Sequence, residues 1–403
     1  MDAADDRLRA GRWLEVFAAF LRLGLTSFGG PVAHIGYFRD AFVARRKWLS
    51  EDAFAELVAL CQFLPGPASS QVGFAIGLIR GGAAGALAAW LGFTLPSAVL
   101  MTAFAFGAGA LKGPLAQGLL HGLKLVAVAV VAQAVLGMAR SLAPDARRAA
   151  IALVAIGVVT MVSAGLGQVG AIGFGALLGL ALRRGADAAP PDVLARTVPA
   201  WAGLAALGLF AALLVAGPIA ERATGSLAIA HFDAFYRSGA LVFGGGHVVL
   251  PLLDAAVVGP GWVDPSRFLA GYGAAQAVPG PLFTFAAYLG AVMRPPPHGL
   301  PGALLGLAGI FLPGLLALIA ALPFWGRMRA WPSAQAAMRG ANAAVVGILA
   351  SALYSPVWTS AVNDRADFAA VAAGFLLLTL FRAPPAVVVA LGAAAGLARA
   401  ALG

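Results

Sequence analysis

Long apolar stretches without a single charged side chain constrain this chain more than any other feature of its sequence. Among the stretches that contain no Lys, Arg, Asp or Glu are 81–111, 149–182, 197–220, 268–293 and 340–363. A helix needs about 20 apolar residues to cross the hydrocarbon core of a bilayer. Only 11% of all residues are charged, whereas an ordinary soluble domain carries about 25%. The sequence therefore predicts an all-α polytopic membrane protein.

Membrane spans are expected at several places along the chain. The stretch 149–182 is too long for one crossing, so we interpret it as two short helices with a turn near Ser163. The expected full spans are 84–110, 115–139, 149–163, 166–182, 198–218, 299–323, 335–357, 366–381 and 385–401.

The net charge of +10 suits a membrane protein that handles an anion. Basic loops collect on the cytoplasmic side of membrane proteins, and a surplus of positive charge attracts anionic solutes. The single cysteine, Cys61, excludes an internal disulfide, and the histidines lack the spacing of a metal site. No Walker motif for ATP is present. We therefore expect no cofactor, no metal and no nucleic-acid partner.

The second part of the chain repeats the first. The motif FGGP at 28–31 recurs as FGGG at 243–246. The motif QFLPGP at 62–67 recurs as QAVPGP at 276–281. Several Gly and Pro residues between positions 82 and 96 recur between positions 299 and 313. Such rare residues at nearly constant spacing indicate an internal repeat.

The repeat predicts two homologous halves, 10–182 and 225–401. The segment 183–224 joins them as a linker with one connecting span, 198–218. A single connecting span, together with Arg clusters assigned to the cytoplasm, predicts that the two halves lie in inverted orientation.

Each half opens with two broken, re-entrant hydrophobic segments, followed by about four membrane spans. The broken segments are 13–36 and 53–79 in the first half, and 232–256 and 267–292 in the second. Pro with neighbouring Gly interrupts the hydrogen-bond ladder of a helix. Within a bilayer such a break persists only where it is buried in protein or lines a cavity. Interrupted segments at matching places in two halves therefore indicate a transport site.

The prolines of the breaks predict the starts of half-helices. Pro31, Pro67 and Pro281 are expected in first helical turns, where proline is favourable. A helix N-terminus offers free N–H groups and about half a positive charge to an anion. Close-packing kinks are the alternative, but the pairing of the breaks favours an anion site. Pro65 and Pro279 complete the breaks, and the residues expected to bind substrate beside them are Ser27, Gly29, Gly30, Gly66, Gly244, Gly245 and Gly280.

Two pairs of polar side chains occupy matching places in the halves. Gln62 and Gln276 each precede the first Pro of a break by three residues, where an amide either donates to a ligand or bridges helices. Arg22 and Arg237 each precede the Phe of a break by six residues. Since the planar guanidinium holds two oxyanion oxygens at once, both arginines are expected to bind substrate. Anchoring at the membrane interface is the alternative for them.

Three further titratable residues are candidates for roles in transport. Glu56 lies about two turns before Pro65, and His34 lies three residues after a break, so both are candidate proton carriers. An interfacial ion pair is the alternative for Glu56, and a packed, hydrogen-bonded side chain is the alternative for His34. His247 follows a break by one residue and is expected to donate to the anion, with a packed, hydrogen-bonded side chain as the alternative for it as well.

The paired motifs resemble those of the chromate ion transporter family in its two-domain form. The matching motifs are FGGP, KWL, QFLPGP and FTLP in the first half, and FGGG, GWV, QAVPGP and IFLP in the second. The resemblance covers nearly the whole chain, with Gly246 standing where the first half has Pro31. It implies export of chromate from bacteria and, for some members, a link to sulfate, which is also a tetrahedral dianion.

The expected function is that of a secondary transporter and not of an enzyme. Chromate would leave the cell across the bacterial cytoplasmic (inner) membrane, driven by the proton gradient. Transport of sulfate or another oxyanion, including its uptake, is the alternative. An intramembrane enzyme would need a nucleophile–base pair or clustered metal ligands, and the predicted spans contain neither. The expected partners are chromate or sulfate, the lipid bilayer and a second copy of the chain in a homodimer.

Overall fold

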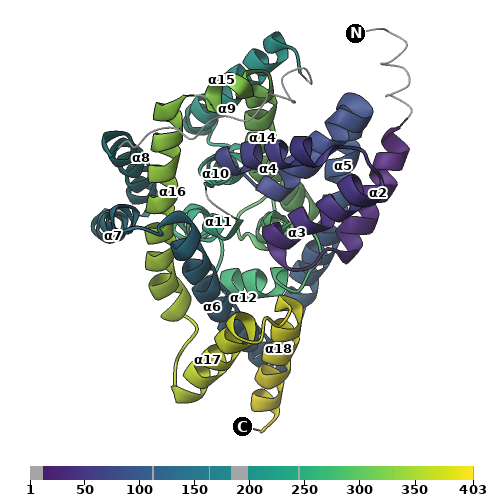
Figure 1. Cartoon of the computed structure of the whole chain (residues 1–403). Coiled ribbons are helices and arrows are strands. Elements are labelled where there is room, and N and C mark those ends of the chain that lie inside the picture. Colours follow the sequence, from purple (N-terminus) through teal and green to yellow (C-terminus); the bar gives the residue numbers. More distant parts are fainter. Residues whose placement is uncertain are drawn as a thin grey trace.

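In the computed structural model every regular element is helical, which confirms the expected all-α class. The structure describes residues 12–110, 113–162, 164–182, 198–243, 246–329 and 331–402, and no strand occurs among them. Figure 1 shows the helices gathered into one bundle. By length and composition, five helices of the described part can cross a membrane: Ala68–Gly107, Pro114–Leu142, Ala200–Thr224, Gly299–Arg327 and Pro332–Trp358.

Helices α2 to α8 form the first half, and both breaks expected there separate two helices. The first break lies between α2 and α3, and the second lies between α4 and α5. Inside α5, the non-helical backbone of Gly81 and Gly82 ends the second broken segment. The bounds are α2 Trp13–Thr26, α3 Gly30–Phe38 with a π-helical continuation over Arg39–Arg45, α4 Glu51–Phe63, α5 Ala68–Ala110, α6 Pro114–Leu142, α7 Ala146–Met161 and α8 Ala164–Ala181.

The second half follows the connecting helix α9, Ala200–Thr224, and repeats this order. Its breaks separate α10 from α11 and α12 from α13. The bounds are α10 Leu227–Ala240, α11 Val249–Leu253 between short helices Gly246–Val248 and Asp254–Val258, α12 Pro265–Ala275, the 3-10 turn Leu282–Thr284, α13 Phe285–Val292, α14 Gly299–Ala321, the 3-10 turn Leu322–Phe324, α15 Trp325–Arg329, α16 Pro332–Ala352 with a π-helical end over Leu353–Trp358, α17 Arg365–Thr379 and α18 Pro385–Leu402.

The last two helices of each half are short for the full spans expected there. Helices α7 and α8 have 16 and 18 residues, and α17 and α18 have 15 and 18. At 1.5 Å per residue, 18 residues reach about 27 Å, less than the hydrocarbon core of about 30 Å. Figure 1 shows α17 and α18, in yellow, as a hairpin whose turn points into the bundle beside α12.

Each half packs its last two helices against the other half. Helices α17 and α18 lie against α6, whereas α7 and α8 lie against α16. The helices approach so closely that a Cβ atom added at Gly122 of α6 would lie 2.1 Å from the carbonyl oxygen of Gly392 in α18. A Cβ atom added at Gly179 of α8 would lie 2.2 Å from the carbonyl oxygen of Ala336 in α16. Small residues permit such backbone contact in membranes, and the two halves therefore interlock.

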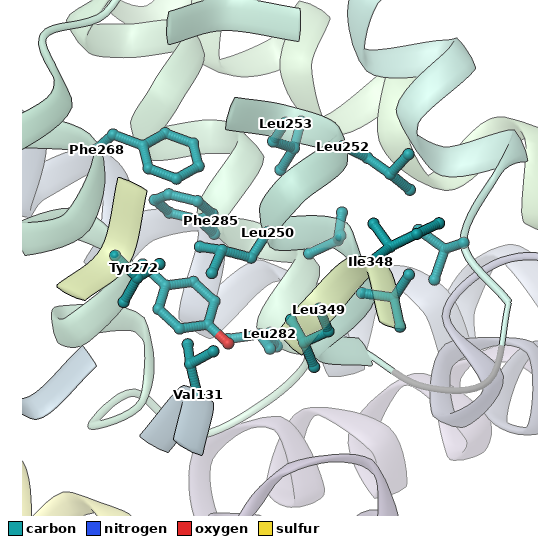
Figure 2. Packing of buried hydrophobic residues seen from close by; sticks show 14 of the residues in the cluster. Val131, Leu250, Leu252, Leu253, Phe268, Tyr272, Leu282, Phe285, Ile348 and Leu349 are labelled. Atoms are coloured by element: carbon teal, nitrogen blue, oxygen red, sulfur yellow. The ribbon is translucent and has the colours of Figure 1, made fainter. Parts of the chain in front are cut away.

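A hydrophobic core centred on the second half supports the broken segments. Phe268 and Tyr272 of α12 are fully buried and pack edge-on against the ring of Phe285 in α13. Figure 2 shows this aromatic group beside Leu250 of α11, with the Tyr272 hydroxyl pointing toward Leu282. Because short helices α11, α12 and α13 are buried here, their broken ends are held in fixed positions.

The outer surface of the bundle is apolar, as a lipid environment requires. Helix α9 buries little of its surface, and its Trp201 and Leu204 are 74% and 58% exposed. A water-soluble protein rarely exposes a large continuous apolar face. The apolar helices and the exposed apolar surface together identify a multi-pass membrane protein.

Candidate anion-binding cavity

The broken segments of the two halves are hydrogen-bonded to each other in a reciprocal manner. The N–H of Gly66 donates to the carbonyl oxygen of Val242 over 2.8 Å, and the N–H of Gly280 donates to that of Ser27 over 2.9 Å. Gly66 and Gly280 correspond in the repeat, as do Ser27 and Val242. Each Pro-Gly-Pro motif is therefore hydrogen-bonded to the backbone at the first break of the other half.

A cavity of about 270 Å³ lies where these segments meet. Among the residues expected to bind substrate, it is lined by Gly29, Gly30, His247, Gln276 and Gly280, which come from both halves. A single water needs only about 10–15 Å³ of such space. The cavity therefore has room for a small anion together with water.

The N-terminus of α3 opens onto this cavity. Gly29 is the N-cap residue in a left-handed conformation with φ of 99°, and no side chain caps the helix. The first N–H groups of a helix have no partner within the helix and carry partial positive charge, so they attract anions. A Cβ atom added at Gly30 would meet no atom within 4 Å, which shows that the backbone faces open space.

Polar side chains of α12 and its neighbours add donors to the cavity. His247 Nδ1 lies 2.6 Å from the hydroxyl oxygen of Tyr272. The Nε2 atom of Gln276 is buried and makes no well-formed hydrogen bond with the described residues, although its amide faces the Tyr272 hydroxyl. Burying an amide donor without a partner costs free energy. An anion oxygen in the cavity would supply the missing acceptor.

The two Pro-Gly-Pro glycines shape the site without offering their N–H groups to a ligand. Their φ values are +114° for Gly66 and +96° for Gly280, which favour glycine. Both N–H groups are already used in the contacts between the halves. The carbonyl oxygen of Ser27 is likewise occupied, because it accepts the hydrogen bond from the N–H of Gly280. The hydroxyl oxygen of Ser27 is buried and has no partner among the described residues.

The expected half-helix prolines lie at helix starts. Pro31 is in the first turn of α3, Pro67 directly precedes α5, and Pro281 directly precedes the 3-10 turn before α13. Pro279 is buried beside Gly280. Pro65 lines a different cavity, which is apolar and measures about 710 Å³.

The two symmetric arginines do not line the anion cavity. Arg22 is exposed on α2. Arg237 lines the apolar cavity instead, where its Nε atom lies 2.7 Å from Asp233 and its Nη2 atom donates to the carbonyl oxygen of Leu214 over 2.5 Å. Its charge is therefore balanced within the protein.

The remaining expected residues also lie outside the cavity. Gln62 is exposed at the end of α4, and Glu56 is buried in the same helix. His34 is buried in α3, with Nδ1 at 3.4 Å from the Ser69 hydroxyl and no partner for Nε2 in the described part. Gly244 and Gly245 lie outside the described residues.

Two cavity residues were missed by sequence reasoning. Gln133 reaches the cavity from α6, and Arg382 reaches it from the turn between α17 and α18. The spacing of the repeat sets Ala350 against Gln133 and Gly165 against Arg382, so symmetry gave no reason to single out either residue.

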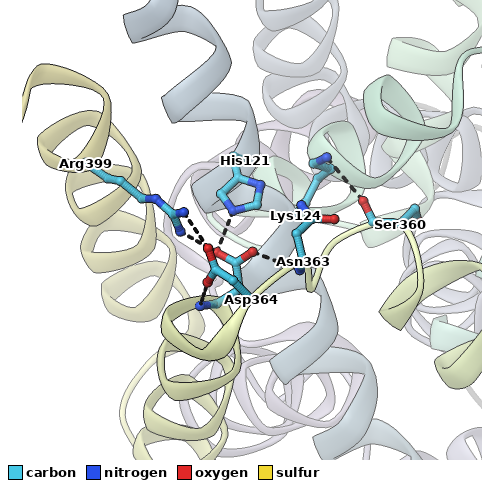
Figure 3. A network of polar contacts seen from close by, with 7 residues as sticks. His121, Lys124, Ser360, Asn363, Asp364 and Arg399 are labelled. Atoms are coloured by element: carbon cyan, nitrogen blue, oxygen red, sulfur yellow. Dashed lines mark hydrogen bonds and ion pairs between the residues drawn. The ribbon is translucent and has the colours of Figure 1, made fainter. Parts of the chain in front are cut away.

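A separate polar cluster fixes the α17–α18 hairpin to the first half. His121 of α6 and Arg399 of α18 lie 2.7 and 2.8 Å from the same carboxylate oxygen of Asp367 in α17. Arg399 also pairs with Asp364 over 2.6 Å. Figure 3 shows this network, in which Lys124 of α6 also donates to the carbonyl oxygen of Ser360. The cluster therefore joins three helices from both halves.

Comparison with known proteins gives the family. The family model for the chromate transporter matches residues 14–180 and 229–397. The chain is 31% identical over 351 residues to the chromate transport protein of Pseudomonas aeruginosa, covering 83% of this chain and 79% of that protein. It is 26% identical over 388 residues to the chromate transport protein of Cupriavidus metallidurans, covering 94% and 91%. A probable chromate transport protein of Synechococcus elongatus is 28% identical over 341 residues, with 83% and 82% covered.

No solved structure matches the chain. The two matched regions coincide with the repeated helix order described above, and the family match extends over most of the chain. This confirms the two homologous halves. The chain belongs to the chromate transporter family, in its two-domain form.

Proposed function

We propose that this protein is a secondary transporter that exports chromate across the bacterial cytoplasmic membrane. The observation that carries the proposal is the cavity at the meeting point of broken segments from both halves. Its lining combines an uncapped helix N-terminus, an amide donor without a well-formed hydrogen bond and an arginine. No Asp or Glu is among the described residues that line it. These are the properties of a site for an anion.

The geometry accounts for an oxyanion in particular. An oxyanion presents several acceptor oxygens, and the donors of the cavity come from different helices and converge on one space. Chromate is the substrate named for the relatives from Pseudomonas aeruginosa and Cupriavidus metallidurans. Sulfate has the same charge and shape, so transport of sulfate or another oxyanion is the second outcome that an experiment must separate.

We further propose that the halves lie in inverted orientation and alternate access to the cavity. The connecting helix α9 supplies one crossing between the repeats, and the reciprocal bonds of Gly66 and Gly280 hold the two sets of breaks together. Inverted repeats around a site near the midplane allow one half to rock against the other. Coupling to protons is assigned to His34 and Glu56, both of which are buried near the breaks.

Everted membrane vesicles that contain the protein test the transport proposal. Labelled chromate should accumulate when a proton gradient is imposed, and unlabelled chromate should compete more effectively than sulfate or molybdate. Sulfate competing better than chromate would establish the alternative substrate. Vesicles that accumulate none of these anions above protein-free controls would refute oxyanion transport.

Two glycine variants distinguish the effect of filling the cavity from the effect of backbone strain alone. Gly30 and Gly261 share φ of +77°, and a Cβ atom at either would meet no atom within 4 Å. Gly30 faces the cavity, whereas Gly261 lies in an exposed turn. Gly30→Val should abolish chromate accumulation because the side chain fills the site, whereas Gly261→Val should leave it intact. Equal transport by both variants would remove the cavity from the transport path.

A further inference from the structure

Arg382 is a cavity-lining arginine with no partner in the described part of the protein. Its side chain lines the anion cavity, and none of the hydrogen bonds or ion pairs among the described residues involves it. Arg237, by contrast, is paired with Asp233, and Arg399 is paired with Asp364. Arg382 is also exposed, so its charge is accessible to an anion from solution.

The backbone at Arg382 is strained. Its φ of +51° lies in the left-handed region, which residues other than glycine seldom adopt. The turn is closed by the N–H of Ala383, which donates to the carbonyl oxygen of Leu377 over 2.9 Å, and Pro385 then begins α18. Strained residues of this kind gather at functional sites. A side chain that binds a ligand would compensate for the strain.

By the spacing of the repeat, Arg382 corresponds to Gly165, which lies in the first turn of α8, whereas Arg382 lies in the turn before α18. The spacing that relates Gly175 in α8 to Gly392 in α18 also relates Gly165 to Arg382. Glycine adopts a left-handed turn without a steric cost. Arg382 thus stands in a turn that glycine would suit, and the first half has no arginine at the corresponding position.

We propose that Arg382 is the residue that recognises the charge of the oxyanion. This inference rests on the proposed function, in which the cavity is the transport site. The planar guanidinium holds two oxygens of a tetrahedral dianion, while the amides of Gln133 and Gln276 donate to the others. No carboxylate among the described residues lining the cavity competes for the guanidinium.

The hairpin that carries Arg382 is attached to α6 at both of its ends, by the Gln133 Nε2 atom, which donates to the carbonyl oxygen of Leu378 over 3.5 Å, and by the polar cluster described above. His121, Asp367 and Arg399 tie α17 and α18 to α6, the helix that also carries Gln133. The guanidinium and the Gln133 amide are therefore presented by elements that are fixed to each other. The predicted selectivity is for doubly charged tetrahedral anions over monovalent ones, because one unpaired positive charge attracts the dianion more strongly.

Chromate binding to the purified full-length protein tests this assignment independently of transport. Asparagine tolerates a left-handed backbone and has no charge, so Arg382→Asn removes the positive charge without adding backbone strain. Loss of a hydrogen bond between a charged donor and an anion raises Kd about ten- to one-hundredfold. Arg382→Asn should weaken chromate binding by that factor, and Arg382→Lys should fall between Arg382→Asn and the unchanged protein. Arg140→Asn, at an exposed position on α6, is the matched control and should bind normally.

The fold of each variant is checked through Cys61, which is fully buried and should stay unreactive toward a maleimide. Arg382→Gly, which suits the left-handed turn without strain, replaces Arg382→Asn if that variant exposes the thiol. Chromate binding of unchanged strength in the folded variant would overturn the role of Arg382, while chromate accumulation in vesicles would leave the proposed function standing. Conversely, vesicles without oxyanion transport would refute the proposed function, and a selective loss of binding in the variant would still support Arg382 as an anion ligand.

Discussion

Replacing Gly66 by Ala tests whether the interlock between the halves depends on close backbone contact. Gly66 has φ of +114°, and a Cβ atom there would lie 2.7 Å from the Cα atom of Gly314 in α14. A side chain in such a backbone conformation costs about 1–3 kcal/mol. Forcing apart a well-packed contact costs about another 1–3 kcal/mol. We therefore expect Gly66→Ala to destabilise the protein by about 2–6 kcal/mol.

Gly261→Ala is the matched control. Gly261 has φ of +77°, but a Cβ atom there would meet nothing within 4 Å. This substitution adds only the backbone strain, about 1–2 kcal/mol. The difference between the two variants mainly reports the contacts of the new Cβ atom with Gly314 and Gln71, because both substitutions add backbone strain.

The buried thiol of Cys61 provides the assay. Cys61 is 0% exposed and lies in α4, the helix that leads into the break at Gly66. When local opening is fast relative to labelling, the maleimide reaction rate follows the population of the open state. A loss of about 2 kcal/mol raises that rate about 30-fold. Equal labelling rates for Gly66→Ala and Gly261→Ala would refute the packing argument.

Two further predictions concern orientation and proton coupling. In a protein with Cys61 replaced by Ser, single cysteines at the exposed positions Ala44 and Pro260 should react with an impermeant maleimide from opposite sides of the membrane, and reaction from one side only would rule out inverted halves. His34→Phe should abolish the dependence of chromate accumulation on the proton gradient while chromate binding persists, because the buried imidazole is assigned to carry the proton. Gradient-driven accumulation by His34→Phe at the normal rate would exclude that role.

The repeat in the sequence was sufficient to predict where the helices break. Gly and Pro act locally on the backbone, so the motifs at 28–31 and 276–281 mark helix ends in any environment. Hydropathy was less informative for α17 and α18, because an apolar composition shows only that a helix avoids water. It does not distinguish a crossing from a hairpin that enters the bundle.

The arginines show where symmetry in the sequence is insufficient. Arg22 and Arg237 match in position, but the residue that neutralises Arg237 does not, since the same alignment of the repeat sets Ala18 against Asp233. Arg382 could not be predicted, because its partner position in the repeat is Gly165 and its neighbours in the cavity come from distant helices. Long-range packing places such a side chain, and no local pattern encodes it.

The reciprocal hydrogen bonds of Gly66 and Gly280 also make each half of the protein structurally incomplete on its own. In each half the Pro-Gly-Pro motif finds its acceptor in the other half, at Val242 or at Ser27. A gene encoding one half alone would make a protein with an open break, and two molecules would be needed to close it.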